Sequence, residues 1–302
     1  MTALRFGLMT HESAPWPELA ERWRGFEAAG WDALWAGDHL WSGGDTAKPR
    51  FEAWLLAAGI ANATSTAAVG TLVSAIGLRN PSVLAKQAVT LDHMSGGRAI
   101  AGIGLGGNPK DLAAAGLDPW PAAERGPRLA EYCAVVRAML DGGAVEVGGT
   151  YYRARGFSAP GPVADRIPLL IAAHLPASIK VAARYADVWS TYGTLFSQLA
   201  RGISLTPDES LAATARRSRL LDAECELLGR DPASVRRSFM LAFTQDTPWL
   251  SVQHFRDTIG RYAELGITEF MFPFPLQGKH DLEVFAEVVE SVLPRLRKGE
   301  RP

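Results

Sequence analysis

The sequence has few cysteines and no excess of charge of either sign. Only two cysteines occur in 302 residues, Cys133 and Cys225, and neither lies near another cysteine or a histidine at metal-ligand spacing. A disulfide framework or a zinc site is therefore not expected. Lys and Arg number 31 against 32 Asp and Glu, which leaves a net charge of -1. Without a dominant field of one sign, nucleic acid and membrane surfaces are not expected as partners.

Long apolar runs and a dinucleotide fingerprint are also missing. No run approaches the roughly 20 apolar residues that span a bilayer. The apolar start at 4–9 is too short for a signal-peptide core, so we expect a cytoplasmic protein. The glycines at 102, 104, 106 and 107 do not reproduce the G-x-G-x-x-G spacing of a dinucleotide site.

What the sequence does have is a regular alternation of two kinds of segment. Short apolar runs alternate eight times with longer segments of helical periodicity, which predicts an α/β fold, a closed (β/α)8 TIM barrel, as one domain over 1–302. The expected strands are 5–10, 33–37, 67–74, 98–103, 168–172, 186–190, 236–242 and 268–272. The expected helices are 17–29, 52–63, 82–93, 124–140, 177–185, one from 206 onward, 251–265 and 282–296. Segments 144–147 and 150–153 predict a small hairpin insertion after the fourth helix, outside the barrel.

In such a barrel, polar residues just past the strand ends gather at one rim, where active sites are built. Asp38 and His39 follow the second expected strand, and a histidine there can move a proton near neutral pH. Adjacent strand residues face opposite sides, so we do not expect the two to act on one ligand atom. The alternative to proton transfer is that His39 has a purely structural role. The residues expected at this rim are Thr10, His11, Glu12, Asp38, His39, Ser74, Asn108, His174, Ser190 and Thr191.

Two turns at this rim expose backbone amides with little side-chain obstruction. They are the glycine-rich segment 102–108 and the segment Ala-Ala-His-Leu-Pro at 172–176. Such turns can hold a phosphate beside a helix start, although a tight turn with no ligand explains the glycines equally well. His11, His39 and His174 stand on separate loops, which is a poor signature for a metal-dependent hydrolase, and no metal site is predicted.

With these residues in view, the chain resembles the luciferase-like (bacterial luciferase-type) oxidoreductase superfamily, and within it the coenzyme F420-dependent branch. The resemblance covers nearly the whole chain. It rests on AAGWDALWAGDH at 28–39, VGTLVS at 69–74 with RNP at 79–81, LDHMSGGR at 91–98, and IAA at 171–173 with ARYAD at 183–187.

The resemblance implies a flavin-like ring that lies across the rim, with Asp38 and His39 near it and His39 as the catalytic, proton-handling residue. It places the Leu72–Val73 peptide, often a cis bond in the family, behind the ring. The phosphate would lie on Gly106, Gly107 and the backbone of residues 174–176. The cofactor-binding residues expected in this way are Asp38, Thr71, Leu72, Val73, Gly104, Gly106, Gly107, Asn108, Ala173, His174, Leu175 and Pro176.

The implied function is hydride transfer between coenzyme F420 and a small organic substrate. Asp-His at the second strand is more similar to F420 users than the Glu-His of many FMN members. An FMN-dependent monooxygenase is the main alternative, and a non-catalytic flavin-binding barrel is the second. The sugar-phosphate dehydrogenase members carry an acid where this chain has Gly107 or Asn108, which leaves the substrate open. Members are commonly dimers, so a homodimer is expected.

Overall fold

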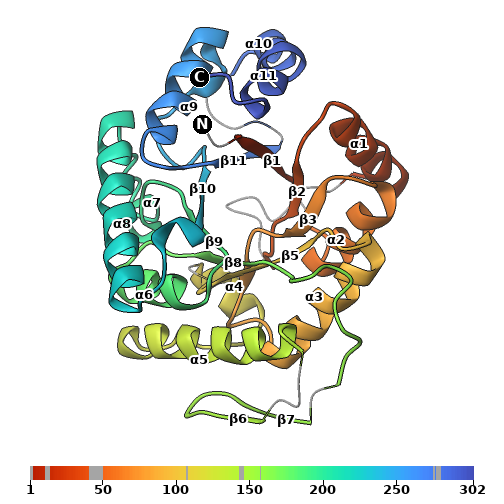
Figure 1. Cartoon of the computed structure of the whole chain (residues 1–302), viewed down its shortest axis with the longest axis vertical. Helices are drawn as coiled ribbons and strands as arrows, with labels where there is room; N and C mark the ends of the chain where they lie inside the picture. The colour runs from red at the N-terminus through yellow and green to blue at the C-terminus, as the bar shows by residue number, and fades with distance from the viewer. Residues whose placement is uncertain are drawn as a thin grey trace.

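The computed structural model describes residues 3–10, 14–40, 50–106, 108–142, 146–156, 158–274, 276 and 280–302. Its main strands are β1 (Arg5–Thr10), β2 (Ala33–Ala36), β3 (Ala68–Thr71), β4 (Ser74–Ala75), β5 (Ala99–Gly104), β8 (Leu169–Ala172), β9 (Val188–Thr191), β10 (Arg236–Met240) and β11 (Glu269–Phe274). These nine strands pair in the order β3-β2-β1-β11-β10-β9-β8-β5-β4, and a pairing of β3 with β5 closes the ring (Figure 1). All these pairings are parallel, and β4 continues the position of β3, so the predicted eight-position barrel is confirmed.

Helices surround the strands, as Figure 1 shows. They are α1 (Trp16–Ala28), α2 (Ala53–Ala63), α3 (Pro81–Ser95), α4 (Pro109–Ala114), α5 (Ala122–Leu140), α6 (Pro176–Tyr185), α7 (Phe196–Leu199), α8 (Pro207–Leu227), α9 (Val252–Ala263), α10 (Leu282–Glu287) and α11 (Leu293–Arg297). Helix α8 begins as its sequence predicts, because Thr206 Oγ1 accepts from the Glu209 N–H at 3.3 Å and the Glu209 carboxylate accepts from the Thr206 N–H at 2.9 Å. None of the described helices is long and apolar enough to cross a membrane.

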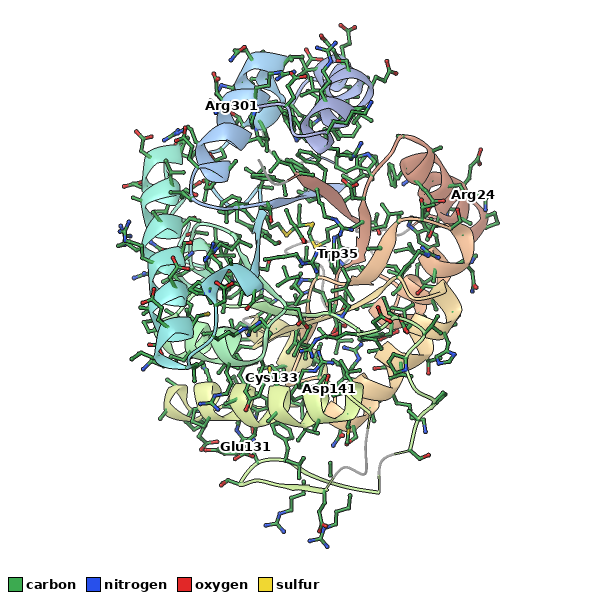
Figure 2. The ribbon with its side chains drawn as sticks, in the orientation of Figure 1. Arg24, Trp35, Glu131, Cys133, Asp141 and Arg301 are labelled. Carbon is green, nitrogen blue, oxygen red and sulfur yellow. The ribbon has the colours of Figure 1, made fainter. Side chains whose placement is uncertain are left out.

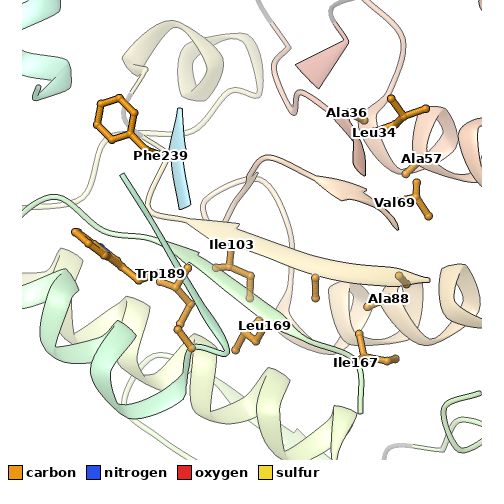
Figure 3. Close-up of a cluster of buried hydrophobic side chains, with 14 of the residues drawn as sticks. Leu34, Ala36, Ala57, Val69, Ala88, Ile103, Ile167, Leu169, Trp189 and Phe239 are labelled. Carbon is orange, nitrogen blue, oxygen red and sulfur yellow. The ribbon is translucent and has the colours of Figure 1, made fainter. Parts of the chain in front are cut away.

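The apolar core has two layers, because side chains alternate across each barrel strand. Along β2, Ala33 and Trp35 face the barrel interior, whereas Leu34 and Ala36 pack against the helices. Trp35 lies near the centre of the barrel in Figure 2, and Figure 3 shows part of the layer between strands and helices. The interior cluster is Met9, Ala33, Trp35, Leu72, Ile100, Leu170, Val188, Met240 and Met271. The interior is therefore filled, and ligands have access at the strand ends.

Several segments differ from the sequence-based prediction. Helices α4 and α7 are not among the expected helices, and the expected helix 282–296 is divided into α10 and α11 by a π-helical stretch at Val288–Val292. The expected strand 67–74 is divided into β3 and β4 by a cis peptide bond at Leu72–Val73, as the resemblance implied. The first hairpin strand, β6, is described over Glu146–Gly148, and residues 144 and 145 of the expected first strand lie outside the described residues. The second hairpin strand, β7 (Arg153–Arg155), starts three residues later than expected. The reason is Glu131 of α5, whose carboxylate accepts from the N–H groups of residues 150–152 and holds them as the turn. Figure 2 places Glu131 on the hairpin side of α5.

Candidate active site

Asp38 and His39 follow β2 directly, and their side chains take different partners. The Asp38 carboxylate pairs with the Arg79 guanidinium, and the His39 imidazole pairs with the Asp111 carboxylate. The two side chains therefore have separate partners within the protein, and the expectation that they do not act on one ligand atom stays a prediction. Each belongs to its own buried carboxylate contact at the C-terminal end of β2.

The His39 imidazole is oriented by Asp111 of α4. His39 Nδ1 lies 2.8 Å from Asp111 Oδ2, and the other oxygen, Oδ1, accepts from the Leu40 N–H at 2.9 Å. Asp111 is 6% exposed, whereas the His39 side chain is 40% exposed. Because an ionised carboxylate only accepts hydrogen bonds, we assign the imidazole proton to Nδ1, which makes Nε2 the basic nitrogen. Such an arrangement can exchange a proton at Nε2, and the catalytic role of His39 stays a prediction.

The Asp38 carboxylate braces the strand next to it. Its Oδ1 accepts from Arg79 Nη2 at 3.0 Å, and its Oδ2 accepts from the Ala75 N–H of β4 at 3.3 Å. Burial lowers the pKa of Arg79, but the hydrogen bonds and charges of Asp38 and Glu52 outweigh burial, so this pKa is raised. Asp38 is only 5% exposed. Its described contacts therefore support the β4 backbone, and a contact with a cofactor ring stays a prediction.

The predicted cofactor segments converge where β4, β5 and β8 lie side by side. Ser74 and Ala75 of β4 pair with residues 103 and 104 of β5, and β5 pairs in turn with β8. A Cβ on Gly104 would lie 2.6 Å from Val73 Cγ2 and 3.6 Å from Ala172 Cβ. A Cβ on Gly106, whose φ is +72°, would lie 2.7 Å from Ala75 Cβ. The backbone of the glycine-rich turn thus approaches the segment that follows Leu72–Val73 as closely as glycine permits.

Some of the expected cofactor-binding residues have their polar groups engaged within the protein. The Thr71 hydroxyl contacts Ser74 Oγ at 2.9 Å and donates to the Gly102 carbonyl at 3.1 Å. The Asn108 side chain accepts from the Lys110 N–H at 3.1 Å and caps α4. These two side chains stabilise the turns of the rim.

The segment at the start of α6 offers fewer backbone donors than its sequence indicates. The Ala173 N–H donates to the Ser190 carbonyl at 3.0 Å, and the Leu175 N–H donates to Ser178 Oγ at 3.2 Å. Pro176 has no N–H. Residues 175–177 are exposed at the start of this ten-residue helix. The first-turn amides of Ala177 and Ser178 are therefore better candidates for an anion than those of Leu175 and Pro176.

His174 is held in the same rim as a neutral residue. Its Nδ1 lies 3.0 Å from Thr191 Oγ1, and its ring packs on Tyr192 with 4.0 Å between centroids. Burial and, to a smaller extent, the nearby charge of Arg217 together lower the pKa of His174 to about 3. His174 is therefore uncharged near neutral pH and serves in hydrogen bonding rather than as a cation.

Gly107, His11 and Glu12 lie outside the described residues. Among the residues that are described, no group of three or more His, Cys, Asp or Glu side chains has the arrangement of a metal site.

The geometry agrees with what comparison with known proteins finds. A family model described as luciferase-like monooxygenase matches residues 1–244. The chain belongs to this family. The F420-dependent glucose-6-phosphate dehydrogenase of Beutenbergia cavernae is 31% identical over 315 aligned residues, which cover 91% of this chain and 92% of that protein. The F420-dependent hydroxymycolic acid dehydrogenase of Mycobacterium tuberculosis is 28% identical over an alignment that covers 79% of this chain and 62% of that protein.

Solved structures support the fold of this luciferase-like protein. An F420-dependent secondary alcohol dehydrogenase in complex with an F420-acetone adduct superimposes with a TM-score of 0.76 at 18% identity, over 98% of this chain and 99% of that one. The coenzyme F420-dependent tetrahydromethanopterin reductase of Methanopyrus kandleri gives a TM-score of 0.75 at 16% identity, over 98% and 100%. At such low sequence identity, the structural similarity shows only that these proteins share the barrel fold.

The sequence did not reveal three residues that shape the site of this luciferase-like protein: Asp111, Arg79 and Arg217. Asp111 had a usable signal, because Asn108-Pro109 is an N-cap followed by a proline, which predicts a short helix with this acid in its first turn. Such a helix after the fifth strand brings its first turn to the rim. Arg79 pairs with Asp38, which is 41 residues away in the sequence, and Arg217 contacts Thr191, which is 26 residues away. No short sequence pattern predicts contacts between residues this far apart.

Proposed function

We propose that this luciferase-like protein is a coenzyme F420-dependent oxidoreductase that transfers a hydride between the deazaflavin and a small organic substrate. The observation that carries the proposal is His39 at the mouth of the barrel, oriented by the buried Asp111 and adjacent to the glycine-rich turn. The F420-dependent dehydrogenase that is 31% identical over almost its full length supports the choice of cofactor.

The rim fits a planar ring with an anionic tail. Leu72 and Val73 lie at the break between β3 and β4 and give the rim an apolar surface that is continuous with the interior cluster. On one side of the rim, Gly106 has no side chain that would contact Ala75. On the other side of the rim, α6 begins with exposed residues. The start of a ten-residue helix favours a phosphate through its amides and dipole. These segments would hold the ring and its tail, respectively.

The reaction needs a hydride acceptor and a base. When bound, the deazaflavin supplies the hydride-accepting or hydride-donating centre. For a hydroxyl substrate, the carbon loses its hydrogen with both bonding electrons, and His39 Nε2 takes the hydroxyl proton as the C=O bond forms. In the reverse direction His39 returns that proton to the oxygen. Asp111 keeps Nδ1 protonated throughout and offsets the charge of the imidazolium.

The cofactor itself provides the first test. We expect the purified protein to bind F420 in a fluorescence titration and to bind FMN much more weakly. Anaerobic incubation with a panel of alcohols and F420 is expected to bleach the deazaflavin absorbance with at least one of them. Tight FMN binding without F420 binding would establish the oxygen-dependent monooxygenase instead, and F420 binding without turnover in either direction would establish a non-catalytic barrel.

The glycine turn gives a second prediction. Gly106→Ala is expected to weaken F420 affinity about tenfold, because the new methyl group displaces the turn from Ala75 and costs roughly one charge-assisted hydrogen bond. Gly116→Ala is the matched control, since Gly116 has a φ of +70° but nothing within 4 Å of its Cβ position. Both variants carry the cost of a left-handed alanine, about 1 kcal/mol. Equal F420 affinity in the two variants would argue against a cofactor at this turn.

We also propose a homodimer and a cytoplasmic location. A groove of about 580 Å³ between α1 and α2 exposes Trp16, Phe51 and Leu55, which are 42%, 43% and 67% exposed. Apolar side chains gathered in this way are frequent at contacts between copies. Sedimentation velocity measures the mass of the particle in solution and so tests the homodimer. The cytoplasmic location stays a prediction from the sequence.

A further inference from the structure

Arg217 brings a half-buried positive charge to the rim of the barrel. It extends from α8, where Nη1 donates to Thr191 Oγ1 at 3.1 Å and Nη2 donates to the Thr194 carbonyl at 2.8 Å. The pKa of Arg217 is lowered to about 10, mainly by burial; the nearby Tyr192 opposes this shift and the neighbouring Arg216 adds to it. The guanidinium is still charged near neutral pH, so the fold keeps a cation here at a cost in desolvation.

Arg217 differs from most other arginines that are partly buried in the described part of the chain. Arg79, Arg137 and Arg236 each pair with at least one carboxylate. Arg98 has no such pair, but it uses all of its donors, with five hydrogen bonds to carbonyl and hydroxyl oxygens. Arg230 also has no carboxylate partner, but it donates to a hydroxyl and to two carbonyls at the C-terminal end of α6, where the helix dipole favours a cation.

Arg217 has none of these compensations among the described residues. A guanidinium has five N–H donors, and two of these are used. Three donors and the whole charge are thus left without a carboxylate. A charge held in this way is typical of a residue whose anionic partner comes from outside the chain.

The surroundings of Arg217 are shaped for binding rather than for acid–base chemistry. Thr191 Oγ1 contacts Arg217 and His174 together, and His174 is neutral, so the two side chains do not repel each other. The Tyr192 ring packs on His174 and on Phe243, with 4.9 Å between the centroids of the latter pair. Tyr192 is also close enough to Arg217 to oppose the lowering of its pKa, and the Tyr192 and Phe243 rings pack against the interior cluster of the barrel.

The position of Arg217 in the barrel relates it to the proposed acid–base residue. In the closed strand order, β9 lies four positions from β2 in either direction. Thr191, the last residue of β9, and His39, which follows β2, therefore lie on opposite sides of the mouth. The predicted phosphate segments follow β5 and β8, between these two positions. A molecule bound at both His39 and Arg217 would therefore cross the mouth beside the ring rather than follow the cofactor tail.

We propose that Arg217 binds an anionic group of the substrate, a carboxylate or a phosphate, and so orients the reacting carbon toward His39. The proposal rests on the proposed function and narrows its substrate to organic anions. A guanidinium suits this role because its planar fork of donors matches both groups in a bidentate manner. The hydroxyl of Thr191 and the carbonyl of Thr194 fix that fork in advance, which reduces the entropy lost on binding.

The test compares Arg217→Gln with Arg216→Gln, a change at the exposed neighbour on the same helix. Both variants lose one positive charge. Inorganic phosphate and acetate are titrated into each F420-loaded protein by calorimetry at constant ionic strength, so that the bound cofactor already covers the tail site. We expect Arg217→Gln to weaken anion binding roughly tenfold or more and Arg216→Gln to leave it unchanged, because charge-assisted hydrogen bonds are lost only in the first. Arg217→Lys is expected to recover part of the affinity.

A second arm separates the substrate from the cofactor tail. The affinity for F420 is compared with that for the deazaflavin chromophore without its phosphate-bearing tail. Arg217→Gln is expected to leave both unchanged, which also shows that the variant is folded. A loss confined to F420 would assign Arg217 to the tail and overturn the proposal. Equal anion binding in the wild type and in Arg217→Gln would overturn it as well.

Failure of the proposed function has a different signature. If the wild type does not bind F420, the cofactor assignment fails. The same anion titration on the unloaded protein still tests Arg217, because only the difference between Arg217→Gln and Arg216→Gln is used. A difference there supports the anion site independently of the cofactor, and its absence overturns it.

Discussion

His39→Ala is expected to lower kcat by about a hundredfold or more while F420 affinity changes by no more than a few-fold. The effect follows from the role of Nε2, which exchanges a proton with the substrate only during the chemical step. KM is expected to change little for the same reason. The measurement is the rate of deazaflavin reduction by the substrate found for the wild type, together with the dissociation constant of F420.

The control for this variant is His254→Ala. His254 is an exposed histidine of α9, and its loss removes an imidazole without changing the mouth of the barrel. We expect wild-type kcat for this control. If His39→Ala retains the wild-type rate as well, His39 has no part in proton transfer, and the hydroxyl proton must leave by another route.

The barrel was predictable because its signals are local. Each strand buries both faces, so its sequence is a short apolar run, and each helix shows its own period and its own end signals. The capping box at Thr206 and Glu209 and the turn after β2 were located from a few neighbouring residues. Because a barrel brings every strand end to one rim, the location of Asp38 and His39 followed from the order of the elements.

The partners of these residues were not predictable in the same way. Asp111 lies 72 residues from His39, and Arg79 lies 41 residues from Asp38. Such contacts depend on which loops pack together at the strand ends. The packing of loops cannot be read from the periodicity of the sequence. Residue type alone identified the proton-handling group but not the carboxylate that selects its tautomer.

The break at Leu72–Val73 and the start of α6 show a second limit. A continuous apolar run at 67–74 gives no sign that its hydrogen-bond ladder is interrupted, and only the resemblance to a family indicated the cis bond. At Leu175, the sequence suggested an available amide, but Ser178 three residues later already accepts its hydrogen bond. Sequence patterns locate polar groups, whereas the number of donors left for a ligand is known only after every bond is assigned.

Asp111→Asn is the second variant with a large expected effect. An amide has one accepting oxygen and one donating nitrogen, but Asp111 accepts from both His39 and the Leu40 N–H. If the amide oxygen keeps the Leu40 bond, its NH2 group faces His39 Nδ1 and favours the tautomer with the proton on Nε2. That tautomer cannot take a proton from the substrate. We therefore expect kcat to fall by about 10²- to 10⁴-fold with F420 affinity retained, as for other carboxylates that orient a histidine.

Asp118→Asn is the matched control, because Asp118 is an exposed carboxylate just beyond α4. It undergoes the same chemical change and has no histidine partner among the described residues, so wild-type kcat is expected. Asp111→Glu keeps two accepting oxygens and is expected to recover part of the activity that Asp111→Asn loses, whereas a role limited to the stability of α4 predicts no such recovery. A second discriminating measurement is the double variant His39→Ala, Asp111→Asn. Because Asp111 acts through His39, the double variant is expected to be no slower than His39→Ala alone, and a further multiplicative loss would show that Asp111 acts independently.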